Sequence, residues 1–258
     1  MAPQDVLTAL RDKNPLVHCI TNYVAMNIAA NVVLAAGASP AMVHAPEEIA
    51  DFTPICGALT INIGTLSTRW QASMMNAATL ASAHKIPWVL DPVAHFISDY
   101  RKRAAQDLLA LRPTIVRGNA SEILALVGEA GAGKGADAGD SVDAAQGAAK
   151  ALAAASGAVI AITGPVDFVT DGAQEAHLSG GSPLMPQITA LGCSQTALMG
   201  AYAASGPAFN AALGALAHFK VAGTAASKLA HGPGSFQMHF LDALAATQPD
   251  DLAKAILS

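Results

Sequence analysis

Residues 141–164 read SVDAAQGAAKALAAASGAVIAITG, and the fold class can be inferred from the order of elements in them. Its first part, residues 141–156, is rich in alanine, the strongest helix former, and Gly157 interrupts it. Residues 158–162 then form a short apolar run with β-branched side chains, which is typical of a strand buried on both faces. The run ends in Thr163-Gly164. The stretch therefore predicts a helix, a buried strand and a polar end to that strand.

The same alternation continues on both sides of this stretch. Short apolar runs predict further strands at residues 15–20, 41–43, 58–63, 88–90 and 114–116. Composition and periodicity predict helices at residues 5–13, 23–36, 69–84, 104–111 and 121–127, another opening at Glu47-Glu48, and an alanine-rich helical tail from Gln195. Strands that alternate with helices predict an α/β protein with a mainly parallel sheet covered on both faces.

Glycines mark the breaks between several of these elements. Gly37 is suited to cap the helix at 23–36, and residues 128–139 are predicted to be a glycine-rich loop. Asp171-Gly172 predicts the turn of a hairpin between strands at 168–170 and 176–178.

Composition limits the class of protein. The chain has 258 residues, of which 52% are hydrophobic and only 13% are charged, whereas an average soluble domain carries about 25% charged residues. High hydrophobicity argues against disorder, and no apolar run is long enough to span a membrane. The low charge suggests that surface is buried against other subunits. Because no linker divides the sequence, we expect one domain over residues 1–258.

The charged residues and cysteines give weaker indications. A net charge of −5, with no basic cluster larger than Arg101-Lys102-Arg103, argues against binding to nucleic acid. Three widely spaced cysteines without a CxxC pair fit a reducing compartment, with no structural zinc site. The first residues have no apolar core of a signal peptide, so we expect a cytoplasmic location.

Polar residues gather where the predicted strands end. Ligands of parallel α/β sheets bind at the carboxyl ends of the strands. The polar residues at those ends are Thr21-Asn22, Gly64-Thr65, Asp91, Arg117-Gly118-Asn119 and Thr163-Gly164. Their convergence predicts a ligand site at this edge of the sheet.

Two of these ends allow a structural and a functional interpretation. Asn119 and Glu122 have the spacing of a helix capping box, whereas Arg117 beside the helix N-terminus suits a phosphate. Asp91, followed by Pro92-Val93, is placed to serve a metal ion or substrate, or to cap the following turn. The sequence has neither a GxxxxGK[ST] loop nor a GxGxxG motif, so it lacks the signatures of the P-loop and dinucleotide-binding folds.

A third candidate stretch, residues 189–195, directly precedes the helical tail. Backbone N–H groups of Gly192, Cys193 and Ser194 are expected to be free for an anion, and Cys193 is expected to have a lowered pKa there. The alternative is that Cys193 is a small apolar residue packed at a helix start.

Taken together, these residues resemble the hydroxyethylthiazole kinase family of the ribokinase-like superfamily. The resemblance covers nearly the whole chain, and its strength lies in seven or more short motifs in the family's order and spacing. They are residues 15–22 (PLVHCITN), 37–42 (GASPAM), 61–66 (INIGTL), 90–93 (LDPV), 117–122 (RGNASE), 163–172 (TGPVDFVTDG), 191–193 (LGC) and 232–236 (GPGSF).

The resemblance implies a fold and a reaction. The fold is a three-layer α/β/α arrangement. The reaction is transfer of the γ-phosphate of ATP, with Mg²⁺, to the primary hydroxyl of 4-methyl-5-(2-hydroxyethyl)thiazole, in the biosynthesis or salvage of thiamine. The resemblance also implies a homotrimer with active sites at the subunit interfaces.

The resemblance also implies roles for individual residues, each at the position that matches the family's motif. Those expected to bind ATP are Arg117, Thr163 and Asn119, and those expected to organise Mg²⁺ are Asp91 and Glu122. Those expected to bind the substrate are Met42, which contacts the thiazole, Ala190, which lines the thiazole or phosphate site, and Asn22 nearby. Cys193 occupies the position of the catalytic base, with Gly192 beside it.

The sequence departs from the family pattern at two places. The usual TGTGC is here TALGC, residues 189–193, and the usually small segment after Val93 contains Phe96 and Ile97. These departures leave two alternatives open. One is a related kinase that acts on another small hydroxylated heterocycle, and the other is a non-catalytic relative that binds the thiazole.

Overall fold

The strands of the described residues, 1–128 and 142–257 of this computed structural model, all join one sheet. They are β1 (Leu16–Ile20), β2 (Ser39–Ala41), β3 (Ala58–Asn62), β4 (Trp88–Asp91), β5 (Ile115–Asn119), β6 (Val159–Thr163), β7 (Asp167–Thr170) and β8 (Glu175–Leu178). Their order is β2-β1-β3-β4-β5-β6-β7-β8, with parallel pairing from β2 to β6 and antiparallel pairing from β6 to β8. The predicted mainly parallel sheet is confirmed.

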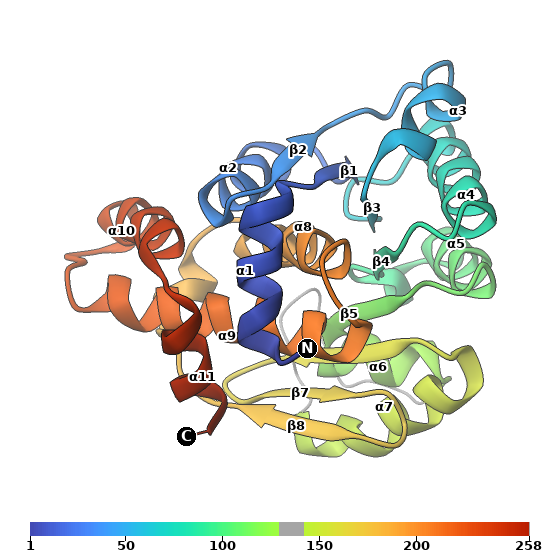
Figure 1. Cartoon of the computed structure of the whole chain (residues 1–258). Helices are drawn as coiled ribbons and strands as arrows, with labels where there is room; N and C mark the ends of the chain where they lie inside the picture. Colours follow the sequence, from blue (N-terminus) through green and yellow to red (C-terminus); the bar gives the residue numbers. More distant parts are fainter. Residues whose placement is uncertain (129–141, 258) are drawn as a thin grey trace.

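Helices cover both faces of this sheet (Figure 1). They are α1 (Pro3–Lys13), α2 (Met26–Ala36), α3 (Ile49–Phe52), α4 (Thr68–Ala83), α5 (Asp99–Ala110), α6 (Ala120–Leu126), α7 (Val142–Ser156), α8 (Leu191–Ala203), α9 (Ala208–Ser227), α10 (Pro233–Ala246) and α11 (Pro249–Leu257). Short 3-10 turns occur at η1 (Thr53–Ile55), η2 (His95–Ile97) and η3 (Met185–Gln187). Within the part of the chain described, no helix is long and apolar enough to cross a membrane.

Side chains that alternate along the strands divide the interior into two cores. Val89 and Ile115 belong to the core shared with α1, α2, α8, α9 and α10, whereas Leu90 and Val116 belong to the core shared with α4, α5, α6 and α7. Successive residues of a strand point to opposite faces, so an uninterrupted apolar run supplies both cores. This explains why the strand at 158–162 carries no polar side chain, and it confirms the three-layer α/β/α arrangement.

α8 is buried on nearly all sides between the sheet and its neighbouring helices. Its residues from Ser194 to Ala203 are all buried, and it contacts β1, β3 and β4 as well as α2 and α9. A helix that is buried all round needs small, mostly apolar residues on every face. This central placement brings the N-terminal end of α8 to the carboxyl edge of the sheet.

Most predicted elements are confirmed, and the differences have local causes. The helix expected from Tyr23 begins at Met26, because the Asn22 side chain accepts a hydrogen bond from the Ala25 N–H and holds a turn. The strand expected at 41–43 is Ser39–Ala41, because these residues pair with β1. The helix expected from Glu47 is a single turn, and the helical tail begins at Leu191 rather than Gln195.

Three further outcomes concern glycines and segment ends. Gly37 caps α2 with a φ of 103°, and Gly172 lies in the hairpin turn between β7 and β8 with a φ of 93°. Both predictions are confirmed. The predicted glycine-rich loop at 128–139 lies, apart from Gly128, outside the described residues.

Candidate active site

A hydrogen-bonded row of polar side chains crosses five neighbouring strands at their carboxyl ends. The Asn22 amide donates to Asn62 Oδ1 (2.8 Å), and the Asn62 amide donates to Asp91 Oδ2 (2.8 Å). Arg117 donates from Nη1 to Asp91 Oδ2 (3.4 Å) and from Nη2 to Thr163 Oγ1 (2.7 Å). We refer to Asn22, Asn62, Asp91, Arg117 and Thr163 as the polar row. It confirms that the polar strand ends converge.

Asp91 is the fully buried centre of this row. Its Oδ2 accepts three hydrogen bonds, the third from Thr196 Oγ1 at 2.6 Å. Its Oδ1 is also buried, and it has no hydrogen-bond partner among the described residues. Burial raises the pKa of Asp91, while Arg117 and the Thr196 and Asn62 hydrogen bonds oppose that shift. A buried oxygen without a partner costs free energy, so Oδ1 is available for a ligand.

Arg117 joins the two halves of the row. Besides Asp91 and Thr163, its guanidinium donates from Nη2 to Gln195 Oε1 at 3.4 Å, and its side chain is only 10% exposed. A Cβ built on Gly192 would lie 3.1 Å from Arg117 Nη2, so the glycine allows the start of α8 to approach the guanidinium. The arrangement places a fixed positive charge beside a helix N-terminus, which favours an anion.

Glu122 and Asn119 form the capping box at the start of α6. Glu122 Oε2 accepts from the Asn119 N–H (2.8 Å), and Asn119 Oδ1 accepts from the Glu122 N–H (2.9 Å). Glu122 Oε1 also accepts from the Ala94 N–H at 2.9 Å. Burial and the nearby charge of Asp91 raise the pKa of Glu122 to about 7. The structural interpretation of this pair is therefore confirmed, and each Glu122 oxygen keeps a second lone pair.

Cys193 lies at the opposite end of the row from Thr163. Its sulfur accepts from the Asn22 amide at 3.4 Å. The prediction of a lowered pKa is wrong, because burial and the charge of Asp91 raise the pKa of the thiol to about 11, outweighing Arg117 and the neighbouring amides. The group of free N–H donors expected here is also smaller, since the Ser194 N–H donates to the Ala190 carbonyl within the helix.

The remaining predicted residues lie at the rim. Ala190 precedes α8 and has a left-handed backbone with a φ of 59°. Met42 directly follows the edge strand β2, next to the strand that leads to Asn22, and it packs partly buried against the core. Neither residue is joined to the polar row by its side chain. Alanine has no polar side-chain atom, and the described hydrogen bonds include none of the Met42 sulfur.

A cavity of about 320 Å³ adjoins this rim. Its walls come from residues just after Asn22, from the segment just before Ala190 and from the start of α10. The residues that line it include Val24, Asn27, Gln187, Thr189 and Gln237. A small organic molecule would fit in this cavity. One of its lining residues, Val24, lies two positions after Asn22 in the sequence.

Two side chains of the site, Asn62 and Thr196, lie outside the predicted set, and Gln195 lies in the candidate stretch 189–195 without a predicted role. Asn62 ends an apolar strand as Asp91 does, so its position is a usable signal, although the polar strand end predicted there is Gly64-Thr65. Thr196 lies three residues after Cys193 and so on the same side of a helix. The spacing of Cys193 and Thr196 therefore indicates that both lie on the side of the helix that faces the site, provided that the helix begins at Leu191.

The carboxylates at this edge fit a magnesium ion. Among the described residues no group of three or more His, Cys, Asp or Glu side chains converges as a metal cage. Mg²⁺ keeps several waters and needs only one or two carboxylates together with substrate phosphates. The unpartnered Oδ1 of Asp91, with Glu122 nearby, meets that requirement.

The fold described above is shared with solved structures of the ribokinase-like class of proteins. Solved structures with this fold include a ribokinase-like superfamily protein of Enterococcus faecalis (TM-score 0.65, 11% identity, 95% of each chain covered). They also include the ADP complex of Bacillus subtilis pyridoxal kinase (TM-score 0.63, 18% identity, 80% of this chain and 90% of that chain covered).

The family is more specific than the class. The model of the hydroxyethylthiazole kinase family matches residues 7–250. Hydroxyethylthiazole kinase of Roseobacter denitrificans is 82% identical, covering 99% of this chain and all of that protein, and the Rhizobium etli enzyme is 58% identical, covering 96% of each. A solved Pyrococcus horikoshii hydroxyethylthiazole kinase superposes with a TM-score of 0.90 at 35% identity, covering 97% of this chain and 95% of that one. The chain belongs to the hydroxyethylthiazole kinase family.

Proposed function

We propose that this chain transfers the γ-phosphate of ATP to the primary hydroxyl of 4-methyl-5-(2-hydroxyethyl)thiazole, a step of thiamine salvage. The observation that carries the proposal is the polar row, which runs from Asn22 to Thr163 in front of the N-terminus of α8. Its two ends differ in chemistry: a cationic end at Arg117 suits phosphates, and a thiol and amide end at Cys193 and Asn22 suits an alcohol.

Arg117 and Thr163 are proposed to hold the phosphates of ATP, with Asn119 beside them. Phosphoryl transfer depends mainly on positioning and on neutralising charge on the transferred group. A buried guanidinium already fixed by hydrogen bonds to Asp91 and Thr163 can do this with little reorganisation. The start of α8 adds the positive end of a helix dipole.

Asp91 and Glu122 are proposed to organise Mg²⁺, partly through water. When bound, the ion neutralises phosphate charge and orients the transferred group. Asp91 offers Oδ1, while its Oδ2 stays fixed by three donors. Glu122 is held by backbone N–H groups at both oxygens, so it would contact water of the ion's shell through its remaining lone pairs.

Asn22, Met42 and Ala190 are proposed to line the thiazole site, with the cavity of about 320 Å³ beside them. Cys193 is proposed to receive the hydroxyl proton as the new oxygen–phosphorus bond forms and the bond to the ADP oxygen breaks. Its raised pKa keeps most of the sulfur protonated at neutral pH, so this help is limited. The loose transition state of phosphoryl transfer needs little of it.

Leu191 and Ile97, two of the residues that depart from the family pattern, affect the site less than their sequence suggests. The Leu191 side chain is buried in the core, and Ile97 is 58% exposed to solvent. Phe96 packs against His95 within η2. This favours the thiazole alcohol over another heterocycle.

The decisive experiment is an assay of ATP consumption with the thiazole alcohol, with and without Mg²⁺. We expect turnover that needs the alcohol and the metal ion. Turnover only with other small alcohols would overturn the substrate assignment. Binding of the thiazole alcohol without any turnover would mean that the chain is a non-catalytic relative.

A further inference from the structure

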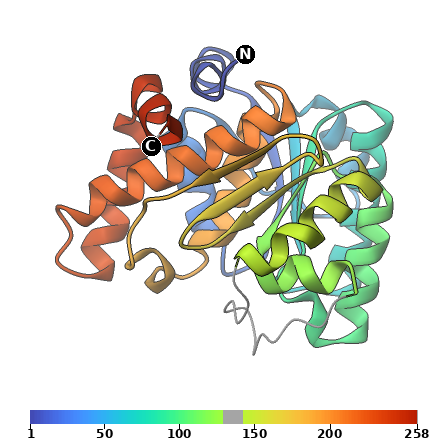
Figure 2. The ribbon, with the colours of Figure 1, turned by 90° about the horizontal axis from the view of Figure 1, so that it is seen from below.

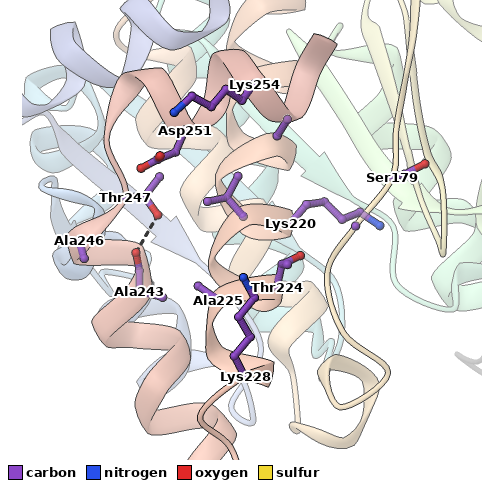
Figure 3. Close-up of a pocket in the computed structure, with 13 residues that line it drawn as sticks. Ser179, Lys220, Thr224, Ala225, Lys228, Ala243, Ala246, Thr247, Asp251 and Lys254 are labelled. Carbon is purple, nitrogen blue, oxygen red and sulfur yellow. Dashed lines mark hydrogen bonds between the residues drawn. The ribbon is translucent and has the colours of Figure 1, made fainter. Parts of the chain in front are cut away.

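A buried lysine of α9 holds a loop of the proposed ATP site. Lys220 is only 6% exposed, and its ammonium group donates to the carbonyls of Gly164 (2.7 Å) and Pro165 (3.0 Å). Figure 3 shows Lys220 among the residues that line a cavity, with its side chain extending from α9 away from Asp251 and Lys254 on the far side of that cavity. The hydrogen bonds of its ammonium group go to the loop after β6.

Asp167 completes this arrangement from the first position of β7. Its Oδ1 lies 3.2 Å from Lys220 Nζ and accepts from the Gly164 N–H at 2.9 Å. The carboxylate is buried, and its Oδ2 has no hydrogen-bond partner among the described residues. Burial raises the pKa of Asp167, and the charge of Lys220 opposes that shift.

The two side chains together fix the backbone of residues 163–167, the loop that joins β6 to β7. They bind one N–H and two carbonyls of this short loop. Figure 2 shows that α9 lies along the hairpin of β7 and β8, so Lys220 reaches the loop from a helix that belongs to another layer. Because the peptide group is planar and trans, a Pro165 carbonyl turned towards Lys220 turns the Val166 N–H away from it.

Thr163 begins this loop, and its hydroxyl accepts a hydrogen bond from Arg117. A buried ion pair gives little net stability compared with apolar residues of similar size, because both charges lose their hydration. Stability alone therefore does not explain why a lysine and an aspartate are buried here. The burial of this pair is explained by the fixed geometry that it gives to the loop beside Arg117.

We propose that Lys220 and Asp167 are positioning residues for ATP, which act by holding the 163–167 loop and so presenting the Thr163 hydroxyl to the phosphates. This inference rests on the proposed function of the site. Neither side chain touches the reacting atoms. Their loss is expected to weaken the use of ATP while leaving the alcohol site unchanged.

The test compares Lys220→Met, Lys220→Arg and the double variant Lys220→Met/Asp167→Asn. For Lys220→Met we expect the KM for ATP to rise about tenfold, with the KM for the alcohol changed less than about twofold. Lys220→Arg should recover part of the loss, since it keeps the charge with a different donor geometry. The double variant leaves no unpaired buried charge, so it should fold even where Lys220→Met does not, yet still show the raised KM for ATP.

Lys150→Met is the matched control. Lys150 pairs with Glu175 of the same hairpin at 2.6 Å, but both side chains are about half exposed. We expect no change in either KM. Wild-type KM for ATP in the double variant, or equal rises in both KM values, would overturn the positioning role. Absence of thiazole phosphorylation in the wild-type protein would instead overturn the proposed function.

Discussion

At the scale of single residues, Arg117 is the group on which the phosphate site depends. It is the only described side chain that bonds to both Asp91 and Thr163, and it is almost fully buried. Its Nε is buried without a hydrogen-bond partner in the described part of the chain. One guanidinium thus links the carboxylate proposed for Mg²⁺ to the hydroxyl proposed for ATP.

We therefore expect Arg117→Ala to raise the KM for ATP by about tenfold to a hundredfold, the effect of losing hydrogen bonds to a charged group. Arg117→Lys should lie in between, because an ammonium cannot bridge two partners as a planar guanidinium does. Steady-state kinetics with varied ATP measures this. An unchanged KM for ATP in Arg117→Ala would remove this residue from the phosphate site.

The proposed role of Cys193 predicts how kcat depends on pH. If the thiolate accepts the hydroxyl proton, kcat should rise with pH below the thiol pKa of about 11, because the thiolate fraction grows. The slope would be at most about tenfold per pH unit. We expect Cys193→Ala to lower kcat, to leave ATP binding unchanged and to lose this slope between pH 7 and 9. Full activity of the variant, or the same slope in both proteins, would exclude the base role.

Glu122 leads to a prediction about how stability, rather than activity, depends on pH. Its pKa of about 7 lies above its ordinary value of 4.5. The folded protein therefore holds this proton where the unfolded chain has lost it, so the free energy of unfolding should fall as pH rises from about 4.5 to 7. The loss would be on the order of 3 kcal/mol.

A magnesium ion held at the proposed site would compete with that proton. We expect Mg²⁺ to raise the melting temperature more at pH 8 than at pH 5.5, as measured by thermal unfolding with and without the ion. Glu122→Gln should reduce the dependence on pH, whereas Glu175→Gln, which changes an exposed carboxylate, should not. Equal stabilisation by Mg²⁺ at both pH values in the wild-type protein would contradict the assignment of Glu122.

At the scale of elements, the start of α8 contains backbone strain. Ala190 has a φ of 59°, a left-handed conformation that a Cβ disfavours by about 1–2 kcal/mol. We expect Ala190→Gly to increase the free energy of unfolding by about 1 kcal/mol. Ala204, which caps the other end of α8 with an ordinary φ of −66°, is the matched control. Ala204→Gly should lower stability, and a loss of stability in Ala190→Gly as well would refute the strain.

Elements were predictable from the sequence where their cause is local. The apolar run at 158–162, the Asp171-Gly172 turn and the Asn119–Glu122 capping box each depend on neighbours within a few residues. The pKa of Cys193 could not be predicted in this way, because it depends on burial and on Asp91, a hundred residues away in sequence. Lys220 could not be predicted for the same reason, since its partners lie on other elements, whereas Asn62 had the local signal of a polar residue at a strand end.

At the scale of the whole molecule, two helices that pack against each other, α2 and α10, carry exposed apolar side chains in or beside them. Val24 and Leu34 lie at the two ends of the α2 region and Met238 lies on α10, each more than half exposed. The cavity beside Ala190 is lined by the same two helices. Exposed apolar side chains beside a cavity are typical of a subunit interface, and such an interface agrees with the low charge of the sequence.

We therefore expect this face to form the interface of a homotrimer that completes the thiazole site. Light scattering coupled to gel filtration should give three times the chain mass, and Leu34→Glu/Met238→Glu should give the mass of one chain with loss of activity. Ile55→Glu, which changes a side chain in η1 that is also more than half exposed, should keep both the trimer and the activity. A wild-type protein that is monomeric and fully active would refute the interface. A monomeric double variant with wild-type activity would show that each chain holds a complete site, because a neighbour that supplies part of the thiazole pocket cannot be removed without loss of turnover.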